Sequence, residues 1–241
     1  MYQNISNIVE ITLKRLALDF MTMLFSPVCG LCNGAITPGE CFICSSCLIQ
    51  LPRERNYQGV DNDTSTRLRG MFQFNEAYSF LRFSKKGQVQ KLIHKVKYRH
   101  QPRLAFQLGV WFASEVLLPI QDRFETIVPV PLHPDKLKSR GYNQSFEIAK
   151  GVSHVTGRPI TEALKRIHKT KTQTQLNRWD RFENTSNEFI IVNADEIQGK
   201  SMLLIDDIIT TGATMAGSVL PLFANGADRI IVAAIGLTQK A

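Results

Sequence analysis

Two adjacent acidic residues near the C-terminus stand shortly before a loop of small hydroxyl and glycine residues. Asp206 and Asp207 follow an apolar stretch at 202–205, and the loop at 210–214 leads into an apolar segment with helical character. The apolar stretch is typical of a buried parallel strand, and open α/β sheets bind ligands at the carboxyl ends of such strands. The sequence therefore predicts a ligand site at this acidic pair.

The loop after the acidic pair has the composition of a phosphate-binding segment. Backbone N–H groups at the start of a helix attract anions, and Gly212 allows the backbone to approach a ligand closely. Carboxylates repel phosphate, so Asp206 and Asp207 must bind something else, either sugar hydroxyls or a bridging cation. Phosphate and hydroxyl sites on one loop indicate a ribose 5-phosphate. The loop residues are Thr210, Thr211, Gly212, Ala213 and Thr214.

The five cysteines all lie at positions 29–47, as two C-x-x-C pairs and one further thiol. Two such pairs can surround one centre with four thiolates, the tetrahedral shell of a structural zinc site. A redox dithiol leaves the second pair unexplained, a ferredoxin-type cluster lacks its proline-flanked fourth ligand, and disulfides conflict with a chain that has no secretory signal. We expect zinc on Cys29, Cys32, Cys44 and Cys47, with Cys41 as a spare thiol.

Positive charge is concentrated in a few segments. The chain has 29 basic and 21 acidic residues and a formal charge of +8, which favours phosphorylated ligands or nucleic acid as partners. Between positions 77 and 114 there are eight Lys or Arg residues and no acid. Interleaved aromatic residues give this stretch the composition of a single-stranded DNA platform, although Phe and Trp at such positions more often belong to the core. These residues are Phe80, Phe83, Tyr98, Phe106 and Trp111.

Residues 202–214 resemble the signature of the type I phosphoribosyltransferases that binds 5-phosphoribosyl-1-pyrophosphate (PRPP): a hydrophobic quartet, an acidic pair and T-T-G-A-T. Further motifs accompany it, namely the cysteine module, the segment 92–98, R-G-Y-N-Q-S at 140–145 and T-Q-T-Q-L at 172–176. Together they resemble the ComF family of competence-associated proteins, which includes GntX-type relatives. The resemblance covers the chain from about residue 20 to its end.

The resemblance implies roles for individual residues. Asp206 and Asp207 would hold the ribose hydroxyls of PRPP, which binds together with Mg²⁺, and residues 210–214 would hold its 5-phosphate. The loop after Val130 would face the pyrophosphate, and the basic segment 165–178, including Lys169 and Lys171, would form a mobile flap. The residues expected on the pyrophosphate side are Pro131, Leu132, His133, Lys138, Arg140, Asn143 and Gln144.

Alternatives remain for some of these residues. Asn143 can instead cap a helix while Arg140 and Gln144 are solvated, and the segment 165–178 can be a linker. Two functions are open: transfer of phosphoribosyl from PRPP to an unknown acceptor, or a non-catalytic competence factor that binds single-stranded DNA and uses the ligand site for structure or regulation. The resemblance implies a role in DNA uptake and natural transformation, with DNA-uptake proteins as partners.

The expected architecture is α/β, a parallel sheet flanked by helices with a small zinc module in front. We expect an amphipathic helix at 1–26, the zinc-binding module at 27–54, a linker and first strand at 55–76, and the phosphoribosyltransferase-like domain at 77–241. No stretch of about 18 predominantly apolar residues is found, so we expect a cytoplasmic protein without a membrane span. Strands are expected near 126–131, 188–193, 201–206 and 229–236, less firmly near 70–83 and 160–167, and helices near 87–98, 103–118, 143–156 and 213–225.

Overall fold

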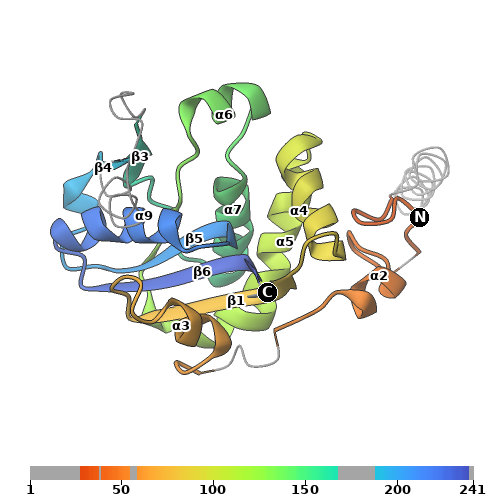
Figure 1. Cartoon of the computed structure of the whole chain (residues 1–241), viewed down its shortest axis with the longest axis horizontal. Coiled ribbons are helices and arrows are strands. Elements are labelled where there is room, and N and C mark those ends of the chain that lie inside the picture. The colour runs from red at the N-terminus through yellow and green to blue at the C-terminus, as the bar shows by residue number, and fades with distance from the viewer. Residues whose placement is uncertain (1–27, 38, 55–58, 168–187, 239–241) are drawn as a thin grey trace, which may run out of the picture. The chain divides into compact units, whose positions relative to one another are not determined.

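The structure is a computed structural model that describes residues 28–37, 39–54, 59–167 and 188–238 (Figure 1). The chain divides into two compact units, Met1–Gln50 and Leu51–Ala241. The N-terminal helix expected at 1–26 lies outside the described residues, as do Lys169, Lys171 and most of the expected flap. The first unit carries the cysteines, and the second carries the acidic pair.

The second unit is built on a parallel sheet of four strands. These are β1 (Glu76–Phe83), β2 (Thr126–Pro129), β5 (Ser201–Ile209) and β6 (Arg229–Thr238), in the order β1-β6-β5-β2. β5 and β6 are buried along nearly their whole length, as expected for a parallel sheet covered on both faces. The predicted fold class, a parallel α/β sheet flanked by helices with a cysteine module near the N-terminus, is confirmed.

Helices cover the two faces of this sheet (Figure 1). One face carries α4 (Gln88–Tyr98), α5 (Pro102–Phe112) and α7 (Gln144–Thr156), and the other carries α9 (Ala213–Ala224). The backbones of α5 and α7 touch. A Cβ atom at Gly109 would lie 2.2 Å from the carbonyl oxygen of Ile148, and one at Gly151 would lie 2.2 Å from that of Phe106. Glycine at both positions therefore sets the spacing of the two helices.

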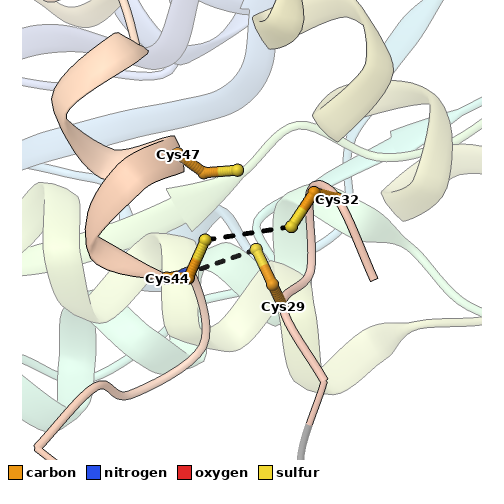
Figure 2. A group of neighbouring side chains, drawn as sticks. All are labelled: Cys29, Cys32, Cys44 and Cys47. Atoms are coloured by element: carbon orange, nitrogen blue, oxygen red, sulfur yellow. Dashed lines mark hydrogen bonds between the residues drawn. The ribbon is translucent and has the colours of Figure 1, made fainter. Parts of the chain in front are cut away.

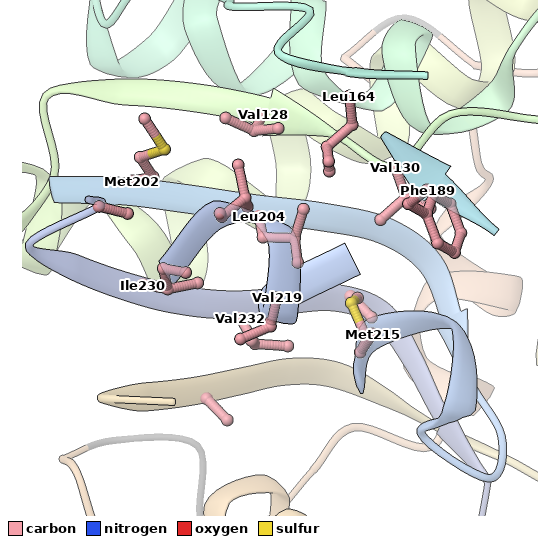
Figure 3. Close-up of a cluster of buried hydrophobic side chains, with 14 of the residues drawn as sticks. Val128, Val130, Leu164, Phe189, Met202, Leu204, Met215, Val219, Ile230 and Val232 are labelled. Atoms are coloured by element: carbon pink, nitrogen blue, oxygen red, sulfur yellow. The ribbon is translucent and has the colours of Figure 1, made fainter. Parts of the chain in front are cut away.

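The core beneath α9 is made by side chains from neighbouring strands (Figure 3). Val128, Leu204 and Val232 come from β2, β5 and β6, and Met215 and Val219 come from α9. Apart from Met215 and Val219, which are 1% exposed, these side chains are fully buried. Burial of such side chains stabilises the fold by about 1.5–3 kcal/mol each. The strands β2 and β5 are therefore firmly packed where the loops of the site begin.

The segment expected as a parallel strand near 188–193 is placed differently. β4 (Phe189–Ile191) pairs antiparallel with β3 (Leu164–Arg166), and the two form a separate sheet. Along β4, Phe189 is buried while Ile190 is exposed, an alternation that suits a short strand with one solvated face. The prediction that this segment joins the main sheet is therefore wrong, and β1 takes a place in that sheet instead.

Short helices occur in two segments where the sequence predicts a linker or a loop. Within the expected linker, α3 (Asp63–Leu68) begins at Asn62, whose side chain accepts hydrogen bonds from the N–H groups of Thr64 and Ser65. The polar residues here form a capping box rather than a solvated linker. After β2, α6 (Pro134–Arg140) begins at His133 and ends at Gly141, which has a φ of 82°. The first unit contains α2 (Ser45–Gln50).

One helical stretch is longer and more apolar than expected. Residues Pro102–Arg123 are long and apolar enough to cross a membrane by composition alone, although half of the apolar window is buried inside the structure. The stretch is not one regular helix, since α5 passes into a π turn (Ala113–Leu117) and then a 3-10 turn (Leu118–Arg123). The expectation that no such stretch exists is wrong. Leu108 and Phe112 face the core, which accounts for the apolar composition.

Candidate functional site

The acidic pair lies in a cleft that opens where β2 stops pairing with β5. The last residue pair of that ladder is Pro129 with Ile205, followed by a 2.9 Å hydrogen bond from the Val130 N–H to the Ile205 carbonyl. β5 continues to Ile209 beside β6 alone. The cavity has a volume of about 200 Å³. Its lining includes Lys97, Tyr98, Val130, Pro131, Leu132, Lys136, Arg140, Gln144, Arg166, Asp206, Asp207, Ile208, Thr210 and Thr214.

Asp206 is buried and firmly held. Its Oδ1 accepts hydrogen bonds from the Ser145 hydroxyl at 2.7 Å and from the Asp207 N–H at 2.8 Å. Burial, followed by the neighbouring charge of Asp207, raises the pKa of Asp206 to about 7 against the opposing effects of Ser145 and Lys97. This carboxyl group is therefore protonated far more readily than an ordinary aspartate.

Asp207 is almost fully buried as well, and it faces a lysine. The Lys97 ammonium lies 2.7 Å from Asp207 Oδ2, and the two side chains are 22% and 3% exposed. A buried carboxylate is costly without a compensating charge. Lys97, near the end of α4, supplies that charge to an acid that lies more than 100 positions away in sequence.

The loop after the acidic pair leads directly into α9. Gly212 adopts a φ of 81° at the start of α9, so the backbone turns sharply into the helix. Thr210 and Thr214 line the cleft. Arg67 holds the outer side of the loop, with its guanidinium 3.3 Å from the Thr210 carbonyl and hydrogen-bonded to the Thr238 carbonyl. Thr214, in the first turn of the twelve-residue helix α9, therefore brings the start of this helix to the cleft, although Thr211, Gly212 and Ala213 are not among the lining residues.

The R-G-Y-N-Q-S segment connects the two loops of the cleft. Asn143 caps α7 by accepting from the Ser145 N–H at 3.1 Å, and its amide nitrogen donates to the Val130 carbonyl at 3.0 Å. Ser145 in turn reaches Asp206. The capping role considered for Asn143 is present, and the same side chain also orders the loop after β2.

Arg140 and Gln144 are not solvated, contrary to the alternative considered for them. Arg140 donates a hydrogen bond to the Gln144 side-chain oxygen, and its guanidinium lies 5.4 Å from the centre of the Tyr98 ring. Both residues are buried and line the cleft. They place one positive charge and one amide beside the acidic pair.

The expected pyrophosphate residues divide into two groups. Pro131 and Leu132 line the cleft with Arg140 and Gln144, whereas His133, Lys138 and Asn143 are absent from the lining that the structure describes. The Nδ1 of His133 accepts from the Asp135 N–H at 3.3 Å and so caps α6. On that helix Lys136 and Arg140 are four positions apart and therefore lie on the same face. Lys138, two positions from each, lies on a different face of the helix. Because the sequence analysis does not predict α6, it cannot tell that Lys136 rather than Lys138 faces the cleft.

Lys97 and Lys136 line the cleft without a role assigned from sequence, whereas Arg166 lies in the segment 165–178 that is expected as a flap. Lys97 lies in the segment 92–98 that supports the family resemblance, but its pairing with Asp207 depends on the packing of α4. Arg166 ends β3, with its guanidinium 2.8 Å from a Glu188 carboxylate oxygen and 5.2 Å from the centre of the Phe189 ring. No local sequence signal indicates that this short antiparallel pair lies beside the cleft.

The cysteines form a compact cluster in the first unit (Figure 2). The sulfur atoms of Cys29, Cys32, Cys44 and Cys47 all lie within 4.8 Å of one another, and those of Cys32 and Cys44 are 3.8 Å apart. Sulfurs bound at about 2.3 Å to a tetrahedral zinc are about 3.8 Å apart. Cys41 is exposed and outside this group. The prediction that four of the five cysteines can hold a metal is confirmed.

The surroundings of the cluster suit thiolate ligands. The Cys29 sulfur accepts the Cys44 N–H at 3.3 Å, and the Cys32 sulfur accepts the Gly34 N–H at 3.3 Å. Burial opposes ionisation of the Cys29 thiol, but N–H groups of Cys32, Cys44 and Leu31 lower its pKa to about 6. Burial raises the pKa of Cys47 to about 12. Because four adjacent thiolates repel one another, a central cation is needed to ionise them together.

Two of the aromatic residues considered as a DNA platform pack against each other. Phe80 is fully buried, and the Trp111 ring packs against it edge to face with centroids 4.5 Å apart. Phe80 therefore belongs to the core, which rules out a stacking role for it, whereas Trp111 is only partly buried. Tyr98, by contrast, is 63% exposed at the rim of the cleft.

Comparison with known proteins identifies relatives in sequence, although no family model matches the chain. DNA utilization protein YhgH of Salmonella typhi is 32% identical over 149 residues, which cover 58% of this chain and 63% of that protein. Competence protein F of Haemophilus influenzae is 37% identical over 134 residues, covering 52% and 57%. Competence protein ComFC of Bacillus subtilis is 22% identical over 191 residues, covering 78% and 74%. The chain thus spans less than two thirds of the first of these relatives.

Solved structures are also similar in part. Glutamine PRPP amidotransferase from B. subtilis matches 55% of this chain and 26% of its own, with 22% identity and a TM-score of 0.39. Purine phosphoribosyltransferase from Pyrococcus horikoshii matches 54% of this chain and 71% of its own, with 16% identity and a TM-score of 0.35.

The raised pKa of Asp206 predicts a specific dependence of stability on pH. A folded-state pKa of about 7, against 3.8 for an ordinary aspartate, means that the folded state retains a proton that the unfolded chain loses. The free energy of unfolding should therefore fall as pH rises from about 4 to 7. Asp206→Asn should remove this contribution and make the protein more stable than wild type at pH 8 by about 1–3 kcal/mol.

Urea denaturation at pH 4.5, 6 and 8 measures this effect. Asp195→Asn, at an exposed acid in the turn Ala194–Glu196, is the matched control and should leave the pH profile unchanged. Identical profiles for wild type and Asp206→Asn would contradict the prediction.

Proposed function

We propose that this chain, a homologue of the YhgH and ComF proteins as its sequence predicts, binds PRPP in the cleft at the carboxyl end of its sheet. The relatives are named for DNA utilization and competence. One observation carries the proposal: two buried carboxylates, a glycine-led helix start and several cationic side chains line a single cavity. A sugar with phosphate groups at both ends matches that combination.

The sugar and its 5-phosphate are assigned to β5 and the loop after it. Asp206 and Asp207 accept hydrogen bonds from the two ribose hydroxyls, while the N–H groups at the start of α9 bind the 5-phosphate. Thr210 and Thr214 add hydroxyl donors from the cleft wall. The Ser145 hydrogen bond keeps Asp206 in place before ligand arrives.

The pyrophosphate is assigned to the opposite wall. Lys136 and Arg140 lie there on α6, with Arg166 on β3. Carboxylate oxygens are ligands that Mg²⁺ accepts, so Asp206 and Asp207 fit a site for PRPP bound together with Mg²⁺, which would neutralise pyrophosphate charge. Positive charge on this wall favours departure of pyrophosphate because it stabilises the negative charge that develops there.

Transfer to an acceptor is the reaction that this arrangement supports. The bond between ribose C1 and the pyrophosphate oxygen breaks, pyrophosphate leaves with the bonding pair, and a nucleophilic atom of the acceptor forms the new bond to C1. Asp206 and Asp207 lie on the sugar side, where carboxylate charge offsets positive charge developing at C1. The acceptor that completes the reaction is to be identified by screening nucleobases and single-stranded DNA for release of pyrophosphate.

Ligand binding is tested by thermal melting with PRPP and Mg²⁺. A ligand that binds the folded state at 100 times its Kd stabilises it by about 2.7 kcal/mol, so the melting temperature should rise with PRPP concentration. Asp206→Asn combined with Asp207→Asn should abolish the rise, while Asp195→Asn should retain it. No shift in the wild-type protein would contradict the proposed site.

We also propose that the cysteine cluster holds zinc. Four sulfur donors without histidine or carboxylate suit zinc in a structural role, and the short module around them has little apolar surface of its own. The purified protein should contain about one equivalent of zinc and no iron by elemental analysis, as expected for a closed four-thiolate site. Cys47→Ser should lose the metal and Cys41→Ser should keep it. Iron in place of zinc, or equal loss in both variants, would contradict this assignment.

A second candidate function is binding of single-stranded DNA along α4, which fits a protein acting on incoming DNA in the cytoplasm. Lys91, His94, Tyr98 and Arg99 are exposed on this helix or at its end, and Tyr98 leads into the cleft. Exposed cations and an exposed aromatic ring are features of single-strand binding surfaces.

Fluorescence anisotropy with a labelled oligonucleotide tests this surface. Affinity should fall steeply between 50 and 200 mM salt, since phosphate contacts release counterions on binding (roughly tenfold or more for several contacts). The double variant Lys91→Glu with Arg99→Glu should bind DNA more weakly. The control Lys200→Glu, at the residue just before β5 begins, should bind as wild type does. Binding that is independent of salt, or equally weakened by both changes, would contradict a DNA surface on α4.

A further inference from the structure

The ion pair between Lys97 and Asp207 lies inside the proposed ligand site. Lys97 Nζ is 2.7 Å from Asp207 Oδ2, and both residues line the cleft. The carboxylate that should accept a ribose hydroxyl is therefore already paired with an ammonium group in the free protein. A ligand that uses Asp207 in this way must compete with Lys97.

Lys97 is held in this position by its helix. Val96 is fully buried beside it, and the hydroxyl of Tyr142 donates a hydrogen bond to the Val96 carbonyl near the C-terminal end of α4. Carbonyl groups at a helix C-terminus favour a cation, which supports a charged lysine there. The backbone of Lys97 is thus fixed, while the four-carbon stem leaves its ammonium free to change partners.

Two other cations of the cleft, Arg140 and Arg166, are placed differently. Arg140 is hydrogen-bonded to Gln144, and Arg166 is paired with Glu188, so their partners are not the carboxylates that receive the sugar. Lys97 is paired with one of those carboxylates. When sugar hydroxyls occupy Asp207, the ammonium of Lys97 loses its counter-charge inside a partly buried cleft, which is unfavourable unless a second anion is nearby.

We propose that Lys97 exchanges partners on ligand binding, leaving Asp207 for the anionic group at C1 of the bound sugar. This inference rests on the proposed function and explains how the site would distinguish PRPP from ribose 5-phosphate. PRPP supplies both the hydroxyls that displace Lys97 and the pyrophosphate that receives it. Ribose 5-phosphate supplies the hydroxyls alone, so it disrupts the ion pair without replacing it. The exchange therefore selects for a sugar that still carries its leaving group.

The first part of the test uses the ligand-free protein. Melting temperatures are measured for Lys97→Met, Asp207→Asn and the double variant. Lys97→Met should lower the melting temperature in the wild-type background and have little effect in the Asp207→Asn background, since the two side chains compensate each other. Lys136→Met, also in the cleft, should show no such dependence on Asp207. Equal effects of Lys97→Met in both backgrounds would overturn the ion pair as a stabilising contact.

The second part measures binding of PRPP and of ribose 5-phosphate, each with Mg²⁺, by calorimetry. Lys97→Met should weaken PRPP binding at least tenfold and leave ribose 5-phosphate binding within threefold of wild type or tighter. Lys97→Arg, which retains the charge and guards against a folding defect, should keep the preference for PRPP within threefold. The control Lys200→Met, at the residue just before β5 begins, should change neither ligand.

The outcomes separate this inference from the proposed function. Wild-type binding of PRPP with an unchanged preference in Lys97→Met contradicts the exchange and leaves the PRPP site intact. Tighter binding of both ligands by Lys97→Met also overturns the exchange, because Lys97 then only obstructs the site. Absence of PRPP binding by the wild-type protein contradicts the proposed function and the exchange together.

Discussion

The burial of two adjacent carboxyl groups is the constraint around which the second unit is organised. Asp206 and Asp207 lie within β5, where apolar side chains on both faces keep water away. β2 stops pairing one residue before them, which gives the acids access to a cleft without exposing them to bulk solvent. Their charge is stabilised by a few groups contributed from distant parts of the chain.

Those groups explain why several motifs occur together. Ser145 reaches Asp206 from the first turn of α7, and Asn143, two positions earlier, holds both that turn and the carbonyl of Val130. Tyr142 fixes the end of α4, from which Lys97 reaches Asp207. A single six-residue segment therefore aligns the end of β2, the acidic pair and the helix that neutralises it.

The sequence predicts the parts of this arrangement that are encoded locally. The acidic pair, the glycine turn into α9 and the two C-x-x-C pairs each lie within a short window, so their residue types and spacing are sufficient. Lys97 is missed because its position depends on how α4 folds back on the sheet, and Arg166, expected in a flap, instead ends a strand of the β3–β4 pair. The polar residues around Asn62 are mistaken for a linker, since a buried capping box and a solvated loop have the same composition.

The glycine pair between α5 and α7 has a mechanical consequence. Where two helices meet backbone to backbone, there are no intervening side chains that can repack, so the helices have little freedom to slide or rotate independently. Ser145 lies on α7, so this helix pair fixes the position from which its hydroxyl donates to Asp206. The position of one acidic carboxyl group is thus tied, through Ser145, to a helix pair whose spacing is set by backbone contact.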